Sequence, residues 1–164
     1  MSKNTVQQTY LDHFKLTPSL YASYTDKDLQ PETTRVLGAW GSLEKNTLSF
    51  VVSTPYSERF LSIAETNQRV ALVSVTLSNY LAYQYKGSIR SIRPTDEEEL
   101  KIVHAYVDEF CRLVTYVGVD PDRYRPGFAK GPYTTIEFEL DSVFDQTPRV
   151  GAGAAIQPTS TPQA

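Results

Sequence analysis

Three hydroxyl side chains and a guanidinium lie close together in the first half of the chain. Ser53, Thr54 and Ser57 precede Arg59 in the stretch TLSFVVSTPYSERFL, residues 47–61. Hydroxyls and free backbone N–H groups at a strand-to-helix junction can bind an anion, and an arginine adds a charge-assisted, bidentate contact. Any capped helix also begins with hydroxyl residues. The pattern therefore indicates a site for a phosphate or another anion, and leaves open a well-capped helix without a ligand.

The same stretch predicts the strand and the helix that would position this site. Leu48, Phe50 and Val52 alternate with other residues, which is typical of a strand with one face in the core. Thr54 can act as an N-cap with Pro55 at the first helical position, and apolar residues then follow at helical spacing. We therefore expect a strand that runs directly into a helix at Thr54.

The remaining elements are predicted from periodicity and turn residues. Further strands are expected at 20–24, 33–40, 69–77, 80–93 and 133–144, a long helix at 95–117 and a short N-terminal helix or arm at 1–16. Strand 33–40 should alternate between faces along its length, and the hairpin loop 42–47 should pair it with the strand that begins at Thr47. Strand 69–77 is almost continuously β-branched, which predicts cover on both faces.

This order indicates a mainly β (α+β) fold, because most connections read as hairpins and only two clear helices interrupt them. A six-stranded antiparallel closed or split β-barrel with flanking helices fits it. Thr95 and Glu98 predict a capping box for the long helix. Residues 119–133 form a long loop rich in tyrosine and arginine, and such loops are either functional or mobile.

Few other residues suggest chemistry. Gln84 and Lys86 lie on the polar face of strand 80–93, which is either solvated or turned towards a polar ligand. Cys111 lies beside the apolar seam of the long helix and is expected to be a buried, inert thiol. His13 and His104 are the only histidines, and with a single cysteine they do not predict a zinc site.

Length and composition limit the function classes. The 164 residues fit one domain, 1–150, with a disordered tail at 151–164 that is too poor in apolar residues to order. The net charge of -3 argues against nucleic acid as a partner, and no apolar run is long enough to cross a membrane. One cysteine excludes an intramolecular disulfide, and the N-terminus lacks an apolar signal region, so a cytoplasmic location is expected.

The sequence resembles the pyridoxamine 5'-phosphate oxidase-like family of FMN-binding split barrels over roughly residues 15–153. The likeness rests on SFVVSTPYSERFLSIAETNQRVAL at 49–72, YQYKGSI at 83–89 and VFDQTPRVGAG at 143–153. These stretches are similar to the family's phosphate-binding turn, its flavin-facing strand and the C-terminal ending of one branch. Arg149 and Val150 replace the Gly-Pro of that ending, and Glu58 stands where the true oxidases tend to have a basic or small residue.

The resemblance implies the following cofactor-binding residues. Arg35, Ser53, Thr54 and Arg59 would hold the phosphate, while Gln84 and Lys86 would meet the isoalloxazine ring or ribityl chain. Val36, next to Arg35, is also expected to contact the cofactor. In the family the second subunit of a homodimer completes the flavin pocket. The longer, substrate-binding C-terminus of the true oxidases has no counterpart here, so their vitamin B6 reaction is not predicted.

The sequence therefore leads to three functional hypotheses. The first is a homodimeric FMN-dependent oxidoreductase that acts on an unknown small molecule with a donor such as NAD(P)H, the flavin supplying the chemistry. The second is a non-catalytic protein that stores or senses flavin or haem. The third is a structural dimer module with an empty pocket. FAD, a deazaflavin or haem remain alternatives to FMN, and the sequence identifies no catalytic residue.

Overall fold

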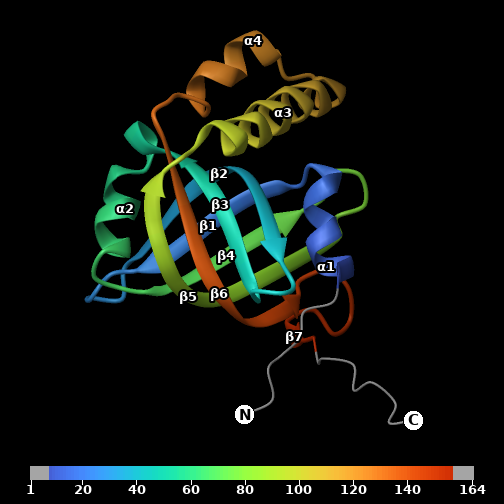
Figure 1. Cartoon of the computed structure of the whole chain (residues 1–164). Coiled ribbons are helices and arrows are strands. Elements are labelled where there is room, and N and C mark those ends of the chain that lie inside the picture. Colours follow the sequence, from blue (N-terminus) through green and yellow to red (C-terminus); the bar gives the residue numbers. More distant parts are fainter. Residues whose placement is uncertain (1–7, 157–164) are drawn as a thin grey trace.

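Six antiparallel strands close into a barrel in the computed structural model, which describes residues 8–156 (Figure 1). The barrel strands are β1 (Ser19–Thr25), β2 (Pro31–Ser42), β3 (Thr47–Ser53), β4 (Arg69–Val75), β5 (Ala82–Pro94) and β6 (Tyr133–Asp145). Their order is β3-β2-β1-β4-β5-β6, and pairing of β3 with β6 closes the ring. A short seventh strand, β7 (Ala154–Ala155), pairs with β6 outside the ring. The predicted six-stranded antiparallel barrel is therefore confirmed.

Helices cover one end and two sides of this barrel. The α-helices are α1 (Gln8–Asp12), α2 (Glu58–Ala64), α3 (Glu97–Val114) and α4 (Pro121–Tyr124), and the 3-10 helices are η1 (His13–Leu16), η2 (Thr54–Tyr56), η3 (Thr115–Val117) and η4 (Arg125–Gly127). In Figure 1, α3 and α4 lie across one end of the barrel, and α2 and α1 flank opposite sides. The core fills the barrel with aliphatic and aromatic side chains, among them Phe50, Leu72 and Tyr85, none of which is exposed.

A β-bulge interrupts β2, so the simple alternation predicted for strand 33–40 is wrong. Between Val36 and Ala39 the register with β3 shifts, and Leu37 and Gly38 together face one residue of β3. Val36 and Leu37 are consecutive, yet both are completely buried. Gly38 has φ 144°, a backbone conformation that L side chains rarely adopt, and glycine accommodates it without strain.

The strand-to-helix junction after β3 also differs from the prediction. Thr54 begins the separate turn η2, which is closed by a hydrogen bond from the Ser57 N–H to the Thr54 carbonyl. The helix α2 begins only at Glu58, with Ser57 as its N-cap residue. Thr54 and Pro55, predicted as the start of the α-helix, therefore belong to a single 3-10 turn. The backbone is not helical at Ser57, so the α-helix starts only after that residue.

The long helix begins one residue later than predicted. The capping box joins Asp96 and Glu99 rather than Thr95 and Glu98, with reciprocal hydrogen bonds of 2.9 and 3.2 Å. The TDEEE sequence allows both registers, and in the observed one Glu99 also pairs with Arg93. Cys111 is buried beside the seam of α3, as expected.

Two further expectations need correction. Strand β4 alternates between buried and half-exposed residues, so within residues 8–156 only one of its faces is fully covered. The tail was expected to lose order from Gly151, but the chain turns there and Ala154–Ala155 pair with the end of β6 as β7. Residues 157–164 and 1–7 of the expected tail and arm lie outside the described residues.

His13 is the first residue of η1 and is a buried packing residue. Its ring lies 4.9 Å from the ring of Tyr83 in an edge-on contact, and neither ring nitrogen has a hydrogen-bond partner among the described residues. Burial lowers the pKa of His13 from 6.5 to about 4, because a charged imidazole would lose its hydration. The fold therefore requires a neutral imidazole at this position.

We predict that His13 makes folding stability depend on pH. Its pKa is lower in the folded state than in the unfolded chain, so its contribution is complete above about pH 6.5 and is lost as the pH falls towards 4. Between about pH 7 and pH 4.5 the loss should be about 2–3 kcal/mol of unfolding free energy. Urea denaturation at both pH values measures the unfolding free energy of wild type and of His13→Phe. Any excess of the wild-type value over that of His13→Phe at pH 7 should shrink or reverse at pH 4.5.

The only other histidine supplies a matched control for this measurement. His104 is exposed on α3, so His104→Phe should retain the wild-type pH dependence. Equal pH profiles for wild type and His13→Phe would show that the buried imidazole does not control acid stability.

Candidate functional site

The guanidinium of Arg35 lies among aromatic rings at the helix-covered end of the barrel. Its central carbon is 4.3 Å from the centroid of the Phe110 ring, 5.1 Å from that of Tyr21 and 5.3 Å from that of Phe128. One terminal nitrogen donates to the hydroxyls of Tyr21 at 2.9 Å and of Tyr124 at 3.3 Å. These contacts hold a permanent positive charge in a largely apolar setting.

No carboxylate neutralises this charge within residues 8–156. None of the ion pairs among these residues includes Arg35. Its Nε and second terminal nitrogen are buried and have no hydrogen-bond partner there. Burial disfavours the charged form, but the oxygens of Tyr106, Tyr21 and Tyr124 outweigh this effect and raise the pKa of Arg35. A buried cation with free donors is costly unless an anion completes it.

A small polar cavity adjoins Arg35. It has a volume of about 130 Å³ and is lined by Thr33, Thr34, Arg35, Ser53, Tyr56, Ser57, Gly127 and Phe128. Arg35 and Ser53 meet there because β2 and β3 pair as the predicted hairpin, with Val36 opposite Val52. The hydroxyls of Thr34 and Ser57 are hydrogen-bonded to each other at 2.6 Å. Hydroxyls and a guanidinium around so small a space suit an anion of the size of a phosphate group.

The segment that follows α3 forms the roof of this cavity. The Tyr56 hydroxyl donates to the Pro126 carbonyl at 2.8 Å, and the Ser53 hydroxyl donates to the Lys130 carbonyl. Arg125 pairs with Asp108 of α3 at 2.7 Å. The segment predicted as a long functional or mobile loop is thus a structured roof that contains α4 and η4.

The aromatic neighbours of Arg35 were not predicted as site residues. Tyr21, Phe110 and Phe128 come from β1, α3 and the roof, which are far apart in sequence. The only sequence signal was the mixture of aromatic and basic residues in 119–133, which indicates a functional loop but not its partner.

Arg59 does not line the cavity. Its side chain is 65% exposed, and its Nε lies 3.2 Å from a carboxylate oxygen of Glu32. One of its terminal nitrogens lies 3.9 Å from a carboxylate oxygen of Asp26. Thr54 is hydrogen-bonded to Thr134 at 2.8 Å and is likewise absent from the lining. The side chain of Val36 is buried in the core. Of the cofactor-binding residues expected in this part of the chain, the structure therefore brings Arg35 and Ser53 to the cavity, together with Ser57, the third hydroxyl residue of the predicted anion site.

Gln84 and Lys86 lie on a different wall of the barrel. They project outward from β5, which is three strands away from β2 in either direction around the ring. Gln84 accepts a hydrogen bond from Gln146 at 3.3 Å, and the Lys86 ammonium lies 4.7 Å from the Phe144 ring centroid. Lys86 also lines a separate cavity of about 220 Å³ with Arg69. Within a single chain, therefore, neither Gln84 nor Lys86 reaches the cavity at Arg35.

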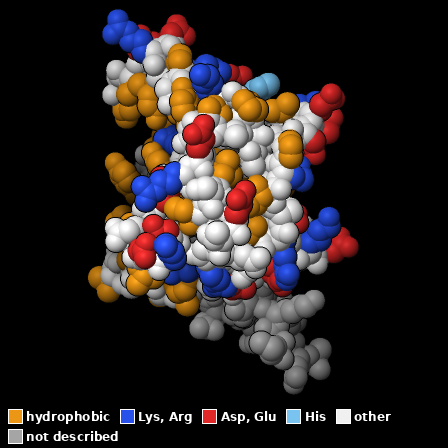
Figure 2. Space-filling model, turned by 90° about the vertical axis from the view of Figure 1, so that its left-hand side faces the viewer, with side chains coloured by type: hydrophobic (Ala, Val, Ile, Leu, Met, Phe, Trp, Pro, Cys, Tyr) orange, Lys and Arg blue, Asp and Glu red, His pale blue; other side chains and the backbone are white. Residues whose placement is uncertain are grey.

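The surface seen in Figure 2 carries lysine and arginine side chains interspersed with aspartate and glutamate, without a continuous basic area on that face. No helix of the described residues is both long and apolar enough to cross a membrane.

Comparison with known proteins identifies the fold. No protein-family model matches the chain, and no curated protein matches it. Among solved structures, HupZ of Group A Streptococcus is 15% identical with a TM-score of 0.55, over 91% of this chain and 98% of that one. A pyridoxamine 5'-phosphate oxidase-related, FMN-binding protein of Nostoc punctiforme is 11% identical with a TM-score of 0.50, over 88% and 85% of the two chains.

A third solved structure, an F420 reductase, is 14% identical with a TM-score of 0.51, over 84% of this chain and 98% of that one. At such identities the likeness concerns the fold alone. The split barrel expected from the sequence resemblance is therefore confirmed as the architecture of this chain.

The free donors of Arg35 predict that inorganic phosphate stabilises the protein. An anion that binds only the folded state at about one hundred times its dissociation constant raises the unfolding free energy by about 2.7 kcal/mol. Thermal denaturation in phosphate and in chloride of equal ionic strength measures this gain. Arg35→Met should abolish it, because the substitution removes the buried charge and keeps a side chain of similar reach.

Arg59→Met is the matched control, since Arg59 is exposed and lies outside the cavity. It should retain the phosphate effect. Loss of the effect in Arg59→Met, or its survival in Arg35→Met, would place the anion elsewhere.

Proposed function

We propose that this protein binds FMN, with the phosphate in the cavity beside Arg35. The observation that carries the proposal is the buried Arg35 guanidinium, whose Nε and second terminal nitrogen have no hydrogen-bond partner among residues 8–156. Ser53 and Ser57 add hydroxyls to the same cavity. The fold supports the proposal, since the Nostoc protein that shares it is described as FMN-binding.

The size of the cavity limits what it can hold. Pockets for drug-sized ligands have volumes of about 300–1,000 Å³, and this cavity has about 130 Å³. It can accept a phosphate but not the isoalloxazine ring, which must lie outside it. Micromolar affinity requires about 8 kcal/mol, whereas a charge-assisted hydrogen bond contributes about 1.5–3 kcal/mol, so the ring also needs a binding surface.

A second copy of the chain supplies that surface in our proposal. Gln84 and Lys86 lie on the wall opposite β2, where they cannot reach a ligand held by Arg35 of the same chain. In a twofold dimer the same two surfaces meet twice, so the β5 wall of one copy can face the Arg35 cavity of the other. The ammonium of Lys86 would then meet the ring or the ribityl chain.

In this proposal the chain binds and orients the cofactor. Bound FMN supplies hydride transfer between a donor such as NAD(P)H and a small-molecule substrate. Arg35 donates hydrogen bonds to the phosphate, the hydroxyls of Ser53 and Ser57 complete its coordination, and Phe128 with the roof excludes water. Proton transfer is not assigned to a residue of this chain.

A binding protein without turnover is the second candidate. The residues around the cavity are hydroxyls, a guanidinium and aromatic rings, which are binding groups. Burial raises the pKa of the only thiol, Cys111, which keeps it protonated. An absorbance spectrum of the purified protein distinguishes bound flavin, deazaflavin or haem, and NADH or NADPH oxidation then distinguishes an oxidoreductase from a storage or sensing protein.

The proposed phosphate site predicts different effects on FMN and riboflavin. Arg35→Met should weaken FMN about ten- to a hundred-fold, because it removes a charge-assisted contact of about 1.5–3 kcal/mol. Riboflavin lacks the phosphate and should lose little affinity. Titration of both ligands by flavin fluorescence measures this, with circular dichroism to show that the variant is folded and Arg59→Met as the control. An equal loss for both ligands would mean that Arg35 does not contact the phosphate.

The proposed pocket also predicts a dimer. Light scattering should give about twice the 18.4 kDa chain mass at tens of micromolar protein, on the order of ordinary working concentrations. Lys86→Gln should weaken FMN and riboflavin alike, because Lys86 is expected at the ring or ribityl chain. A monomer that binds FMN with unchanged affinity would contradict the shared pocket.

A further inference from the structure

Strand β4 has an apolar outer face that one chain leaves half-exposed. The stretch that forms it, RVALVSVTL at 69–77, is almost continuously apolar, which is typical of a strand covered on both faces. Its inward residues are buried, whereas three outward residues are only half-buried: Ala71, Val73 and Val75. Leu77, just beyond the end of the strand, is 42% exposed. The outer face of β4 therefore has the composition of a buried surface without being buried in the single chain.

The neighbouring strand β1 extends this face. The two strands lie side by side in the barrel, with Tyr21 opposite Val73 and Ser23 opposite Ala71 (Figure 1). Side chains of directly opposite residues in an antiparallel pair point to the same face, so these four lie on the outside of the barrel. We call the outward residues that the two strands place opposite each other the β1–β4 wall, which consists of Ser19, Tyr21, Ser23, Ala71, Val73 and Val75.

The β1–β4 wall carries no charged residue, unlike the part of the barrel next to it. On β5 and β6, Arg90 pairs with Glu139, and Lys86 adds a further charge. The cores of subunit interfaces are depleted of charged residues in the same way. Ser23 and Ala71 are also small, so another surface can approach the wall closely. Composition and half-burial thus both indicate a surface that a second molecule covers.

Strand register places this wall midway between the two halves of the proposed flavin pocket. One row of paired residues crosses the outside of the barrel in the order Arg35, Tyr21, Val73 and Gln84. Neighbouring strands are about 4.8 Å apart, so Arg35 and Gln84 are about 14 Å apart along this row. In a twofold dimer, Arg35 of one copy directly faces Gln84 of the other when the axis crosses the middle of the row, between β1 and β4.

We propose that two copies of this chain associate through the β1–β4 wall, with the twofold axis along the strands between β1 and β4. Tyr21 of one copy then packs against Val73 of the partner subunit. Each barrel curves away on both sides of the contact, so two equivalent crevices flank it. Arg35 of one copy lines each crevice together with Gln84 of the partner subunit. The position of the axis rests on the proposed flavin pocket, whereas the half-exposed face of β4 supports the interface independently.

A second copy explains the wall better than an unrelated protein does. An unrelated protein would bury the apolar residues but would bring neither Gln84 nor Lys86 to the crevice beside Arg35. The wall is also continuous with the Arg35 site, because the Tyr21 hydroxyl accepts a hydrogen bond from Arg35 at 2.9 Å. Tyr21 therefore belongs both to the proposed interface and to the surroundings of the guanidinium.

A charge placed near the axis tests the interface in the full-length protein. Val73→Lys brings two ammonium groups together across the axis, so it should raise the dissociation constant of the dimer about a hundredfold or more. At about 10 µM protein, light scattering should change from the dimer mass towards the 18.4 kDa of one chain. Circular dichroism checks that the variant is folded, since a lysine on the outside of a strand should be tolerated in the monomer.

Ile92 provides the matched control. It is an apolar, β-branched barrel residue like Val73 and is 37% exposed. It lies on β5 beyond the pairing with β4, which ends at Ser88. Ile92→Lys should therefore remain as dimeric as the wild type.

Cross-linking tests the position of the axis by a second route. The only native thiol, Cys111, is buried, so the wild type should react little with a short bis-maleimide. Val73→Cys should form covalent dimers, because its two thiols lie on either side of the axis. Ile92→Cys should give only singly modified chains.

The outcomes separate this interface from the proposed flavin function. A monomeric wild type, an intact dimer in Val73→Lys, or equal cross-linking of the two cysteine variants would overturn the interface. Monomeric Val73→Lys should still be stabilised by inorganic phosphate, because Val73 does not line the Arg35 cavity, but it should bind FMN about tenfold or more weakly. If the wall forms the dimer but FMN does not bind, the interface is confirmed and the flavin function is wrong.

Discussion

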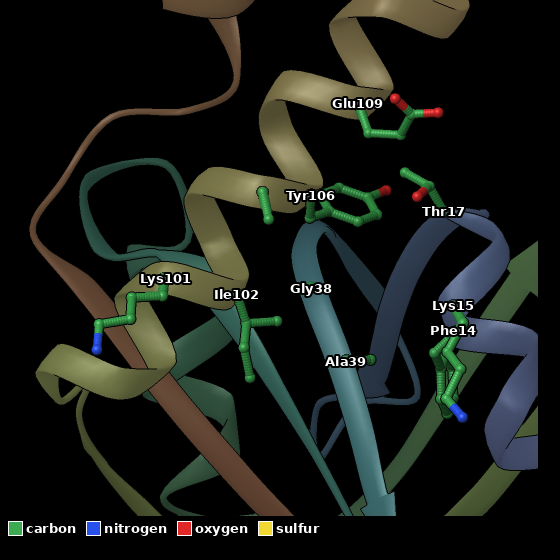
Figure 3. A pocket seen from close by; sticks show the side chains of 10 residues that line it. Phe14, Lys15, Thr17, Gly38, Ala39, Lys101, Ile102, Tyr106 and Glu109 are labelled. Atoms are coloured by element: carbon green, nitrogen blue, oxygen red, sulfur yellow. The ribbon is translucent and has the colours of Figure 1, made fainter.

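The β-bulge at Leu37 and Gly38 determines how this barrel opens, because it ends the pairing of β2 with β1 while the pairing with β3 continues. Before the bulge, Arg35 is held beside Tyr21 and beneath α3. After it, Gly38 and Ala39 line a second cavity, the groove of about 520 Å³ between α3 and η1 (Figure 3). A Cβ atom at Gly38 would lie 3.4 Å from a methyl carbon of Ile102, and the φ of 144° would strain any other residue. One glycine thus allows both the bulge and the close approach of α3.

The environment of Arg35 is better suited to a bound anion than to a purely structural arginine. Each cation–π contact contributes about 0.5–2 kcal/mol and each hydrogen bond to a neutral group about 0.5–1.5 kcal/mol. Transfer of a charge from water into a protein interior costs several kcal/mol even after relaxation. The rings and hydroxyls around Arg35 offset much of this cost, but two nitrogens remain without a partner among the described residues. A phosphate in the adjoining cavity would neutralise the charge.

The sequence predicted local structure well and side-chain partners poorly. The hairpin loop 42–47 was enough to pair β2 with β3, because register in a hairpin follows from the loop. The partner of Arg35 was not predictable in this way, since the register at the loop would place Arg35 opposite Thr54 and only the bulge moves it opposite Ser53. The partners of Arg59 were not predictable, since Glu32 and Asp26 belong to the segment around the β1–β2 turn and reach α2 only in the folded barrel. The bulge was hidden because Gly38 is compatible with a regular strand. The roof was hidden because its contacts to Tyr56 and Ser53 span about seventy residues or more.

The helix α3 borders both the groove and the aromatic surroundings of Arg35, so its position affects both. Its first turn is fixed by Glu99, which accepts from Arg93 of β5 at 2.6 and 2.8 Å and from Thr135 of β6 at 2.8 Å. Although burial opposes ionisation, these hydrogen bonds lower the pKa of Glu99 and keep it charged. Further along, Tyr106 is tied to Pro18.

The rings of Tyr106 and Phe110 stack with centroids 5.8 Å apart, and Phe110 faces Arg35. The helix is therefore anchored to β5, β6, β1 and β2, one turn after another. Because Tyr106 lines the groove and Phe110 contacts the guanidinium, a shift of α3 large enough to widen the groove would also move the aromatic face against which Arg35 lies. Both cavities thus depend on the same rigid placement of one helix across the open end of the barrel.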